Sequence, residues 1–510
     1  MQSRADFSLR SASAELHGAS LKPHAGSSPP HIVALLICLA SGLRAADQDP
    51  DREIKRLVDV FSILESEAAD PISSEAVIYQ GAIPGMLRTL DPHSIFFDPG
   101  QFQQLQQMQR SEQKGFGMIV SVLPGRVIVL QTMEGTPSAK AGLSGGDEIL
   151  AINNIALSRL EPEELIQFMG QARQHEVSLD VRRPGNARLL RFGLTPALVD
   201  TPTVDRDFLL SPGIGFLRLT AFEGPTGKLV KQTIEKLGGA ALKGLVIDLR
   251  GNPGGDVQAA VDMASLFLEP DQLIFTVKGR TADGESVRVK KLNRPYTFPL
   301  AVLVDAKSAS ASEIFSGAMQ DHDRASILGE PTYGKGLVQK VYPLSAGSGL
   351  ALTTAFYYTP SGRSIQKPLQ GVELSAASTM AEGPFKTDKG RLVRGGGGIQ
   401  PDEIVLPESQ SRLRSVLDAT GSFTSFATEY LRTHDIPENF EVPGAMLDEL
   451  KVFLSERQIQ PSLSDWLKDR EWIQSRLKQD LLNLKFGVAV GDQIELKRDP
   501  VVNAALKHIR

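Results

Sequence analysis

The stretch LAVLVDAKSASASEIFSGAM, residues 300–319, joins an expected strand to an expected helix. Leu300–Val304 is an unbroken apolar run, which favours a buried strand, and Ile314–Met319 carries apolar residues at helical spacing. The serines within Ser308–Glu313 therefore lie where the strand turns into the helix. The free N–H groups at the start of a helix favour a developing negative charge, as an alkoxide or oxyanion requires.

The same residues have a structural interpretation. Ser310 and Glu313 have the spacing of a capping box, which is worth about 1 kcal/mol and needs no catalytic role. Catalysis by a serine requires a base, and Lys335 lies downstream between Gly334 and Gly336. A lysine acts as a base only if desolvation lowers its pKa from about 10.4 towards 7–8, which costs roughly 4 kcal/mol.

The glycines on either side of Lys335 have no side chains, so a serine or a substrate can approach the amine closely. If Gly336–Val341 is a strand, its period of two places Lys335, Leu337 and Gln339 on one face. Gln339 could then hold the amine by a hydrogen bond without charging it.

The stretch from Ser308 to Gln339 resembles the active-site region of the carboxyl-terminal processing (tail-specific) serine proteases. In that family the nucleophile is followed by a lysine twenty-five positions later and a glutamine four positions beyond it. This resemblance implies a Ser310–Lys335–Gln339 arrangement and leaves Ser308 and Ser312 with structural roles. It also implies an α/β protease core (ClpP/crotonase-like) with an inserted β-rich PDZ domain and helical N- and C-terminal regions.

Composition is that of a globular protein. The chain is 41% hydrophobic and 23% charged, and its net charge is −5. Its length of 510 residues suggests about three domains. With no long basic run, this balance argues against nucleic acid as a partner.

Residues 1–46 differ from the rest of the chain. The apolar run Ile32–Leu43 is too short to span a bilayer comfortably, and small residues follow it, so we expect a signal peptide or N-terminal anchor and export to the periplasm or cell envelope. A disordered tail with an apolar patch is the alternative. Cys38, the single cysteine, lies in this segment, so the mature chain would have no disulfide.

Residues 47–112 show a helical pattern, with a second helix expected at Ser74–Thr89. The turn Asp91–Ser94 follows that helix and resembles the family's N-terminal segment. His93 lies in this turn, where we expect a structural role rather than catalysis, because the proline ends the helix and the polar side chains can satisfy its backbone.

Residues 113–198 resemble a PDZ domain; a small β-rich domain with glycine turns is the alternative. Gly115-Phe116-Gly117-Met118 takes the place of the family's carboxylate-binding loop, Ile119–Val122 the adjacent strand and Glu163–Met169 the groove helix. Gly142–Asn153 matches the PDZ turn and strand. The implied ligand is a peptide C-terminus that adds as a strand to the sheet edge.

Residues 199–408 alternate strands with helices, which favours an α/β core. The expected helices are Thr226–Leu237 and Val257–Leu268. The expected strands are Gly215–Ala221, Leu245–Leu249, Leu273–Val277 and Ala301–Val304. Asp248–Gly255 is a glycine turn whose N–H groups could face a ligand, or simply a tight loop.

In the resembling proteases this turn lies beside the nucleophile. Gly254 or Gly255, together with the Ala311 N–H, is therefore expected to form the oxyanion hole. Two other sites are disfavoured. Gly329–Lys335 has the spacing of a phosphate-binding loop but is followed by Gly336 instead of Ser or Thr. A triad based on His322 is disfavoured because His322 lies roughly 18 Å along the helix from Ser310, which is too far for direct proton transfer.

No metal-ligand spacing is found, so we expect no metal and no cofactor. Residues 367–399 are predicted to be a mobile surface insertion. Residues 409–510 are expected to be a helical region that could pack on the core, cap the tunnel or mediate oligomers. The resemblance implies an exported endopeptidase that acts on proteins or peptides with accessible C-termini. A catalytically silent PDZ-bearing scaffold is the alternative.

Overall fold

The computed structural model describes residues 50–110, 114–199, 203–280, 282–291, 294–368 and 384–509. The expected signal peptide, residues 1–46, lies outside these ranges. The described residues form two compact units, a larger one from 103–339 with 353–509, and a smaller one from 50–102 with 340–352. None of the helices in the described ranges combines the length and the apolar character that crossing a membrane requires.

The smaller unit contains the N-terminal helices. Its elements, with the helix that continues into the larger unit, are α1 (Pro50–Glu67), a π-helical segment (Ala76–Ala82), α2 (Ile83–Arg88), β1 (Ile95–Phe97) and α3 (Pro99–Arg110). The π-helical segment and α2 together match the expected second helix. Asp91 Oδ1 accepts the N–H groups of His93 (2.7 Å) and Ser94 (2.8 Å), so His93 lies in a turn that the Asp91 carboxylate closes.

The larger unit is built on a six-stranded sheet. Its strands, in spatial order, are β10 (Val204–Ser211), β11 (Ile214–Leu219), β12 (Gly244–Asp248), β15 (Leu300–Val304), β16 (Ser326–Gly329) and β21 (Glu403–Ile404). β10 is antiparallel to β11, and the remaining pairs are parallel.

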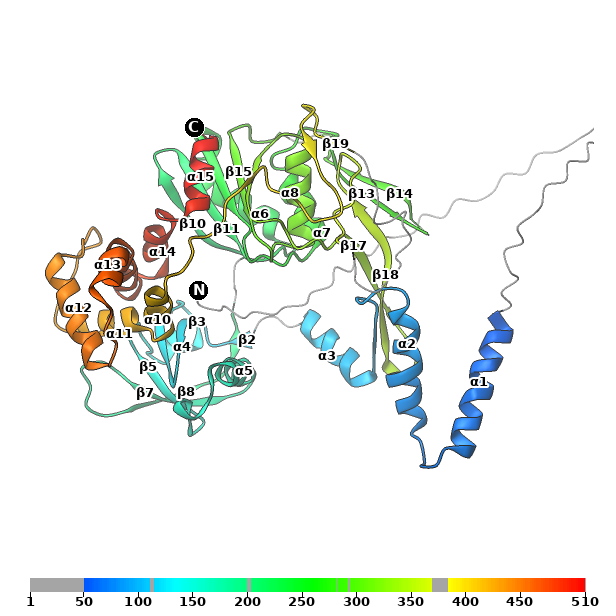
Figure 1. The fold of residues 1–510 in the computed structure, drawn as a ribbon, viewed down its shortest axis with the longest axis horizontal. Coiled ribbons are helices and arrows are strands. Elements are labelled where there is room, and N and C mark those ends of the chain that lie inside the picture. The colour runs from blue at the N-terminus through cyan, green and yellow to red at the C-terminus, as the bar shows by residue number, and fades with distance from the viewer. Residues whose placement is uncertain are drawn as a thin grey trace, which may run out of the picture. The chain divides into compact units, whose positions relative to one another are not determined.

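Helices cover both faces of this sheet, as Figure 1 shows. One face packs against α6 (Thr226–Leu237), α7 (Val257–Ala264) and α8 (Ala311–Asp321), and the other against α15 (Pro500–Ile509). Along β15, Val302 packs in the core on the side of α6, α7 and α8, and its neighbours Ala301 and Leu303 pack in the core on the side of α15. Because alternate residues point to opposite faces, a strand buried on both faces has an unbroken apolar sequence.

The described residues also form two other sheets. One runs β1–β18–β13–β14, with β17 also paired to β18, and comprises β13 (Leu273–Gly279), β14 (Ala282–Arg288), β17 (Leu337–Pro343) and β18 (Gly349–Tyr358). The other has the order β3 (Met118–Leu123), β4 (Arg126–Thr132), β5 (Glu148–Ile152), β7 (Val177–Arg182) and β8 (Leu190–Leu194), with β6 (Ile155–Ala156) on β5. β3 is therefore an edge strand.

The sheet that begins with β3 packs with α5 (Pro162–Ala172) around its own apolar core. Short elements close the ends: α4 (Pro137–Lys140), and β2 (Lys114–Gly115) paired with β9 (Ala197–Leu198).

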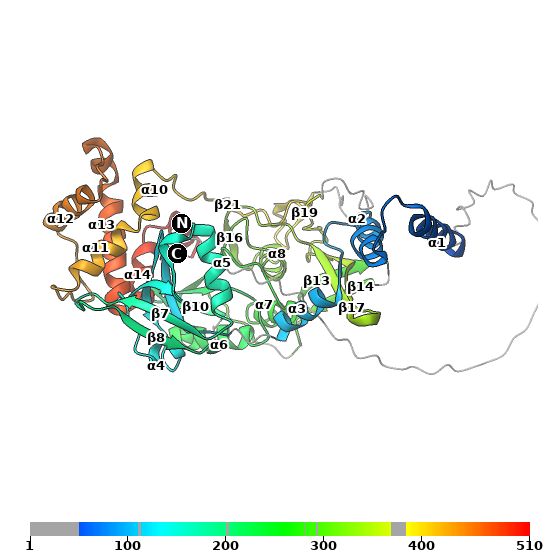
Figure 2. The same cartoon turned by 90° about the horizontal axis from the view of Figure 1, so that it is seen from below.

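The C-terminal helices form a separate core, and Figure 2 shows α10 to α13 grouped together. They are α10 (Arg412–Ala419), α11 (Ser422–Tyr430), α12 (Gly444–Glu456), α13 (Leu463–Phe486) and α14 (Val488–Leu496). The N–H of Val488, at the start of α14, donates to Gln131 Oε1 on β4 (3.1 Å). The helical region therefore contacts β4.

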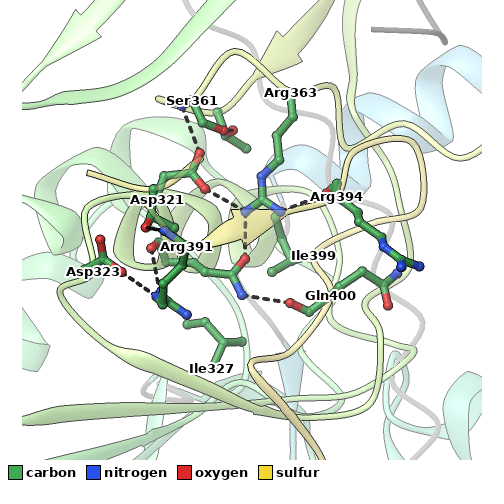
Figure 3. Close-up of polar contacts among 12 residues, drawn as sticks. Asp321, Asp323, Ile327, Ser361, Arg363, Arg391, Arg394, Ile399 and Gln400 are labelled. Atoms are coloured by element: carbon green, nitrogen blue, oxygen red, sulfur yellow. Dashed lines mark hydrogen bonds and ion pairs between the residues drawn. The ribbon is translucent and has the colours of Figure 1, made fainter. Parts of the chain in front are cut away.

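The prediction of a mobile surface insertion is wrong for residues 384–399, whereas residues 369–383 lie outside the described ranges. The described part contains the hairpin β19 (Phe385–Lys386) and β20 (Leu392–Val393), and Ile399 is completely buried. Arg391 pairs with Asp323 (2.5 Å), and the buried Arg363 pairs with Asp321 (2.8 Å) at the end of α8 (Figure 3). The Arg391–Asp323 pair, together with the hydrogen bond that Arg363 donates to Arg394 O (2.9 Å), fastens a polar segment that looks loose in sequence.

Candidate active site

Ser310 lies at the strand-to-helix turn that the sequence predicts, immediately before α8. Its backbone has φ 53° and ψ −113°, a conformation that costs a non-glycine residue of order 1–3 kcal/mol and persists only where the surroundings enforce it. The neighbouring hydroxyls supply that enforcement, since Ser308 donates to Leu249 O (2.8 Å) and Ser312 to Asn252 O (3.1 Å).

The glycine turn at the end of β12 lies against Ser310. A Cβ added to Gly254 would stand 2.8 Å from both the Ala311 nitrogen and Ser310 Cβ. The Gly254 N–H donates to Asn252 Oδ1 (2.9 Å), so it is already used within the turn.

Gly255 has a different environment. Phe222 N–H donates to Gly254 O (2.9 Å), and Asp256 N–H donates to Phe222 O (2.8 Å). In this parallel pairing the N–H of Gly255 itself faces away from Phe222. Among the described residues, neither this N–H nor that of Ala311 has a hydrogen-bond partner. Two unpaired donors therefore belong to the residue after Ser310 and to the glycine turn that lies against it.

Glu313 joins the serine turn to the lysine loop. Its Oε2 accepts the backbone N–H groups of Ser310 (2.9 Å) and Lys335 (2.9 Å), which puts those two nitrogens within about 6 Å of each other. Its Oε1 accepts from Gly334 N–H (2.7 Å) and Thr332 Oγ1 (2.5 Å). The structure thus brings Ser310 and Lys335 together through a completely buried carboxylate.

Further hydrogen bonds fix the lysine loop. The Gly336 N–H donates to Gln366 Oε1 (2.9 Å), and Lys367 N–H donates to Gly334 O (3.1 Å). Thr332 Oγ1 accepts the N–H of Ile399 (2.7 Å), so the segment after residue 384 reaches this network. The backbone on both sides of Lys335 is therefore held in place.

Burial governs the ionisation of this pair. Burial lowers the pKa of the Lys335 ammonium, and the charge of Glu313 offsets this only in part. Burial also raises the pKa of Glu313, against the opposing effect of its four hydrogen bonds. Both shifts are in the direction of the neutral amine, which is the form that can accept a proton.

Gln339 is half-buried on β17, four residues beyond Lys335. The strand begins at Leu337, one residue later than expected, so Lys335 itself precedes it. Gln339 is not among the residues that Glu313 binds.

The loop of Gly115-Phe116-Gly117-Met118 precedes the free edge of β3. Gly117 O accepts the N–H of Met133 (2.8 Å) and the hydroxyl of Ser138 (2.8 Å), which fixes the loop from behind. In the described part of the chain, the N–H groups of Phe116 and Gly117 have no hydrogen-bond partner. Paired free donors beside an open strand edge suit a terminal carboxylate followed by an added strand.

The disfavoured sites are also placed by the structure. His322 follows the far end of α8, where Nδ1 contacts Asp388 (2.7 Å) and Nε2 contacts Leu273 O (2.7 Å). In the phosphate-loop candidate, the N–H groups of Gly334 and Lys335 bind a carboxylate, so they are not available to a phosphate. Within the described ranges, no group of three or more His, Cys, Asp or Glu is arranged to hold a metal ion.

Sequence reasoning missed the second role of Glu313. The Ser-x-x-Glu spacing was the only signal, and a local cap explains that spacing completely. Glu313 does close the cap through the Ser310 N–H, but its contacts to Gly334 and Lys335 come from a distant segment.

Comparison with known proteins gives two family matches. Residues 213–374 match the model of peptidase family S41, and residues 105–182 match that of the PDZ domain. A carboxy-terminal-processing protease of Bartonella bacilliformis is 32% identical over 338 residues, covering 65% of this chain and 77% of the relative. A carboxyl-terminal-processing protease of Synechocystis sp. is 35% identical over 298 residues, covering 56% and 68%.

A solved structure, the photosystem II D1 C-terminal processing protease, is 25% identical and covers 69% of this chain and 86% of that chain, with a TM-score of 0.40. An overlap of that quality supports no residue-level correspondence. The identity and coverage of the sequence relatives decide the classification, and on that basis the chain belongs to the carboxyl-terminal processing (tail-specific) serine proteases with a PDZ domain.

Proposed function

We propose that this protein is an exported serine endopeptidase that recognises substrate C-termini through its PDZ domain and cleaves peptide bonds with a Ser310–Lys335 dyad. The observation that carries this proposal is the buried Glu313 carboxylate, which binds the backbone N–H groups of both residues. Such an arrangement sets the position of the nucleophile and of the base at once.

In the proposed mechanism, the neutral Lys335 amine takes the proton of the Ser310 hydroxyl as the oxygen attacks a peptide carbonyl. The tetrahedral intermediate places its oxyanion between the N–H groups of Ala311 and Gly255. Its collapse releases the amine product, protonated by Lys335, and leaves an ester on Ser310. Water, deprotonated by Lys335, then hydrolyses that ester.

Two observations support the assignment of the oxyanion donors. The Gly254 N–H is used by Asn252, whereas the Gly255 N–H is unpaired among the described residues. Gly254 instead provides space, because any side chain there would meet Ser310 and Ala311. We assign Gln339 the role of orienting the Lys335 amine, on the resemblance and on its place on β17.

Substrate capture is assigned to the edge of β3 and the loop Gly115–Met118. A C-terminal segment would pair with β3 as an added strand, and its carboxylate would accept the free N–H groups of Phe116 and Gly117. A scaffold without turnover would share this groove. The lowered pKa of Lys335 and the two unpaired donors favour the enzyme, because a scaffold needs neither.

The finer organisation is part of the proposal. We divide the chain into a signal peptide or anchor (1–46), an N-terminal helical region (47–112), the PDZ domain (113–198), a ClpP/crotonase-like protease core (199–408) and a C-terminal helical region (409–510). The export of the protein to the periplasm or cell envelope rests on the apolar run before residue 46.

The experiment uses the chain from Asp47 onward with an unfolded protein as the substrate. Wild type should produce fragments, and Ser310→Ala and Lys335→Ala should produce none while keeping their circular dichroism spectra. Ser316→Ala, on the same helix α8, is the matched control, since its buried hydroxyl has no hydrogen-bond partner among the described residues, and it should keep most of the activity. Equal cleavage by wild type and Lys335→Ala would reject the dyad.

A further inference from the structure

We propose that Asp499 is a positioning residue for the oxyanion turn, acting through Arg250. Asp499 belongs to the connection between α14 and α15, outside the region matched by the peptidase family. The proposal rests on the proposed function in one respect, the assignment of the turn Asp248–Gly255 to the oxyanion hole.

Arg250 opens that turn and is held between two carboxylates. Its Nε and Nη2 donate to Asp248 Oδ1 (2.9 Å) and Oδ2 (2.8 Å), and its Nη1 donates to Asp499 Oδ2 (2.6 Å). Although burial lowers the pKa of Arg250, the two carboxylates more than compensate and raise it. A bidentate pair on one side and a second anion on the other leave the guanidinium a single orientation.

The rest of the turn is fastened from other directions. Gly251 N–H donates to Asp305 Oδ1 (2.9 Å), and the Asn252 side chain donates to Leu219 O (2.9 Å). Arg250 is the residue of this turn that an ion pair connects to the C-terminal helices. Losing that connection therefore leaves the Arg250 side chain held by Asp248 alone, in a short loop whose end carries the Gly255 N–H.

Asp499 is itself rigid. Its Oδ1 accepts the N–H groups of Val501 (2.8 Å) and Val502 (3.3 Å), so it caps α15 with one oxygen and binds Arg250 with the other. Val501 and Val502 are buried in the core that α15 forms with the six-stranded sheet. The carboxylate therefore lies at the start of a helix that is packed on the sheet.

A second ion pair provides the control for the alternative that Asp499 only attaches the C-terminal helices to the core. Asp492 on α14 pairs with the buried Arg206 on β10, and this ion pair also joins the C-terminal helices to the core. β10 is the edge strand of the sheet, whereas β12, which leads into the turn, is the third strand. Breaking the Asp492 pair tests attachment of the helices without touching the turn.

The experiment compares Asp499→Asn with Asp492→Asn in the chain from Asp47 onward. Asparagine keeps an oxygen to cap α15 but removes the negative charge from Arg250. We expect Asp499→Asn to lower kcat about tenfold to a hundredfold, because misplacing a catalytic group by 1 Å costs about that much, and to leave KM within about twofold. Asp492→Asn should keep kcat within about twofold at a similar loss of thermal stability.

Hydrogen exchange followed by mass spectrometry gives a readout that does not need activity. Amides of residues 251–256 should exchange faster in Asp499→Asn than in wild type, and at the wild-type rate in Asp492→Asn. An equal loss of kcat in both variants, or unchanged kcat and exchange in Asp499→Asn, would overturn the proposal. An inactive wild type would instead reject the proposed function, and exchange at the turn would still decide whether Asp499 holds it.

Discussion

Replacing Glu313 by glutamine removes the charge of the carboxylate that joins Ser310 to Lys335 and one of its two acceptor oxygens. The single oxygen of glutamine can serve the N–H groups of Ser310 and Lys335 if the amide nitrogen takes the place of Oε1. The Gly334 N–H then loses its acceptor, and the Thr332 hydroxyl has to turn. One orphaned buried N–H costs about 1–3 kcal/mol of unfolding free energy.

The charge has a separate effect on the base. Glu313 raises the pKa of Lys335 against the effect of burial, so its removal lowers that pKa further. Activity requires the neutral amine and rises with pH through the Lys335 pKa, so the acid limb of the rate profile should move to lower pH. The plateau should fall about tenfold to a hundredfold, because the base is weaker and less well placed.

The assay is kcat/KM for a fluorogenic peptide across the pH range, together with thermal unfolding. Glu330→Gln is the matched control on the same connection, since its side chain is only partly buried and lies outside the Glu313 network. A limb that moves to higher pH, or an unchanged plateau, would refute the role assigned to Glu313.

Three further predictions follow from the same geometry. Lys335→Met should be inactive yet more stable than wild type at neutral pH. Burial lowers the pKa of this lysine in the folded state. The unfolding free energy of the wild type, measured with urea, should therefore rise relative to that of the variant as the pH increases from that lowered pKa to about 10.4. Parallel stability curves would contradict this. Gly254→Ala should lower kcat at least about a hundredfold, because its Cβ would stand 2.8 Å from the Ala311 nitrogen, whereas Gly251→Ala, also at positive φ but with open space, should stay active. Amidating the substrate C-terminus should raise KM and leave kcat unchanged, since the amide cannot replace the carboxylate that the loop Gly115–Met118 is expected to bind; equal KM for both forms would argue against that loop.

The elements of the core were predictable where burial dictates sequence. Leu300–Val304 is buried on both faces, which leaves only apolar residues along the strand. The helix Thr226–Leu237 was confirmed at both ends, where its apolar stripe begins and where Gly238 adopts a positive φ. The expected Val257–Leu268 helix ends earlier, at Ala264; Phe267 and Leu268 are buried although they lie beyond the helix, so the apolar pattern runs past its end.

The site was predictable only in part. The spacing of Ser310 and Lys335 is readable because the family resemblance supplies it. The contacts of Glu313 to Gly334 and Lys335 are not, since they depend on how two separate segments meet. The same reason explains the error over residues 384–399, because the ion pair of Arg391 with Asp323 joins positions far apart in sequence.

The most direct test of the central claim is the pH dependence of covalent labelling at Ser310. Wild type and Lys335→Ala would be treated with a fluorophosphonate across a pH series, and the labelled residue identified by mass spectrometry. The account predicts a label on Ser310 whose rate rises with pH around a midpoint below about 10.4, and loss of that rise in Lys335→Ala. A label on another residue, or the same pH profile in both proteins, would contradict it.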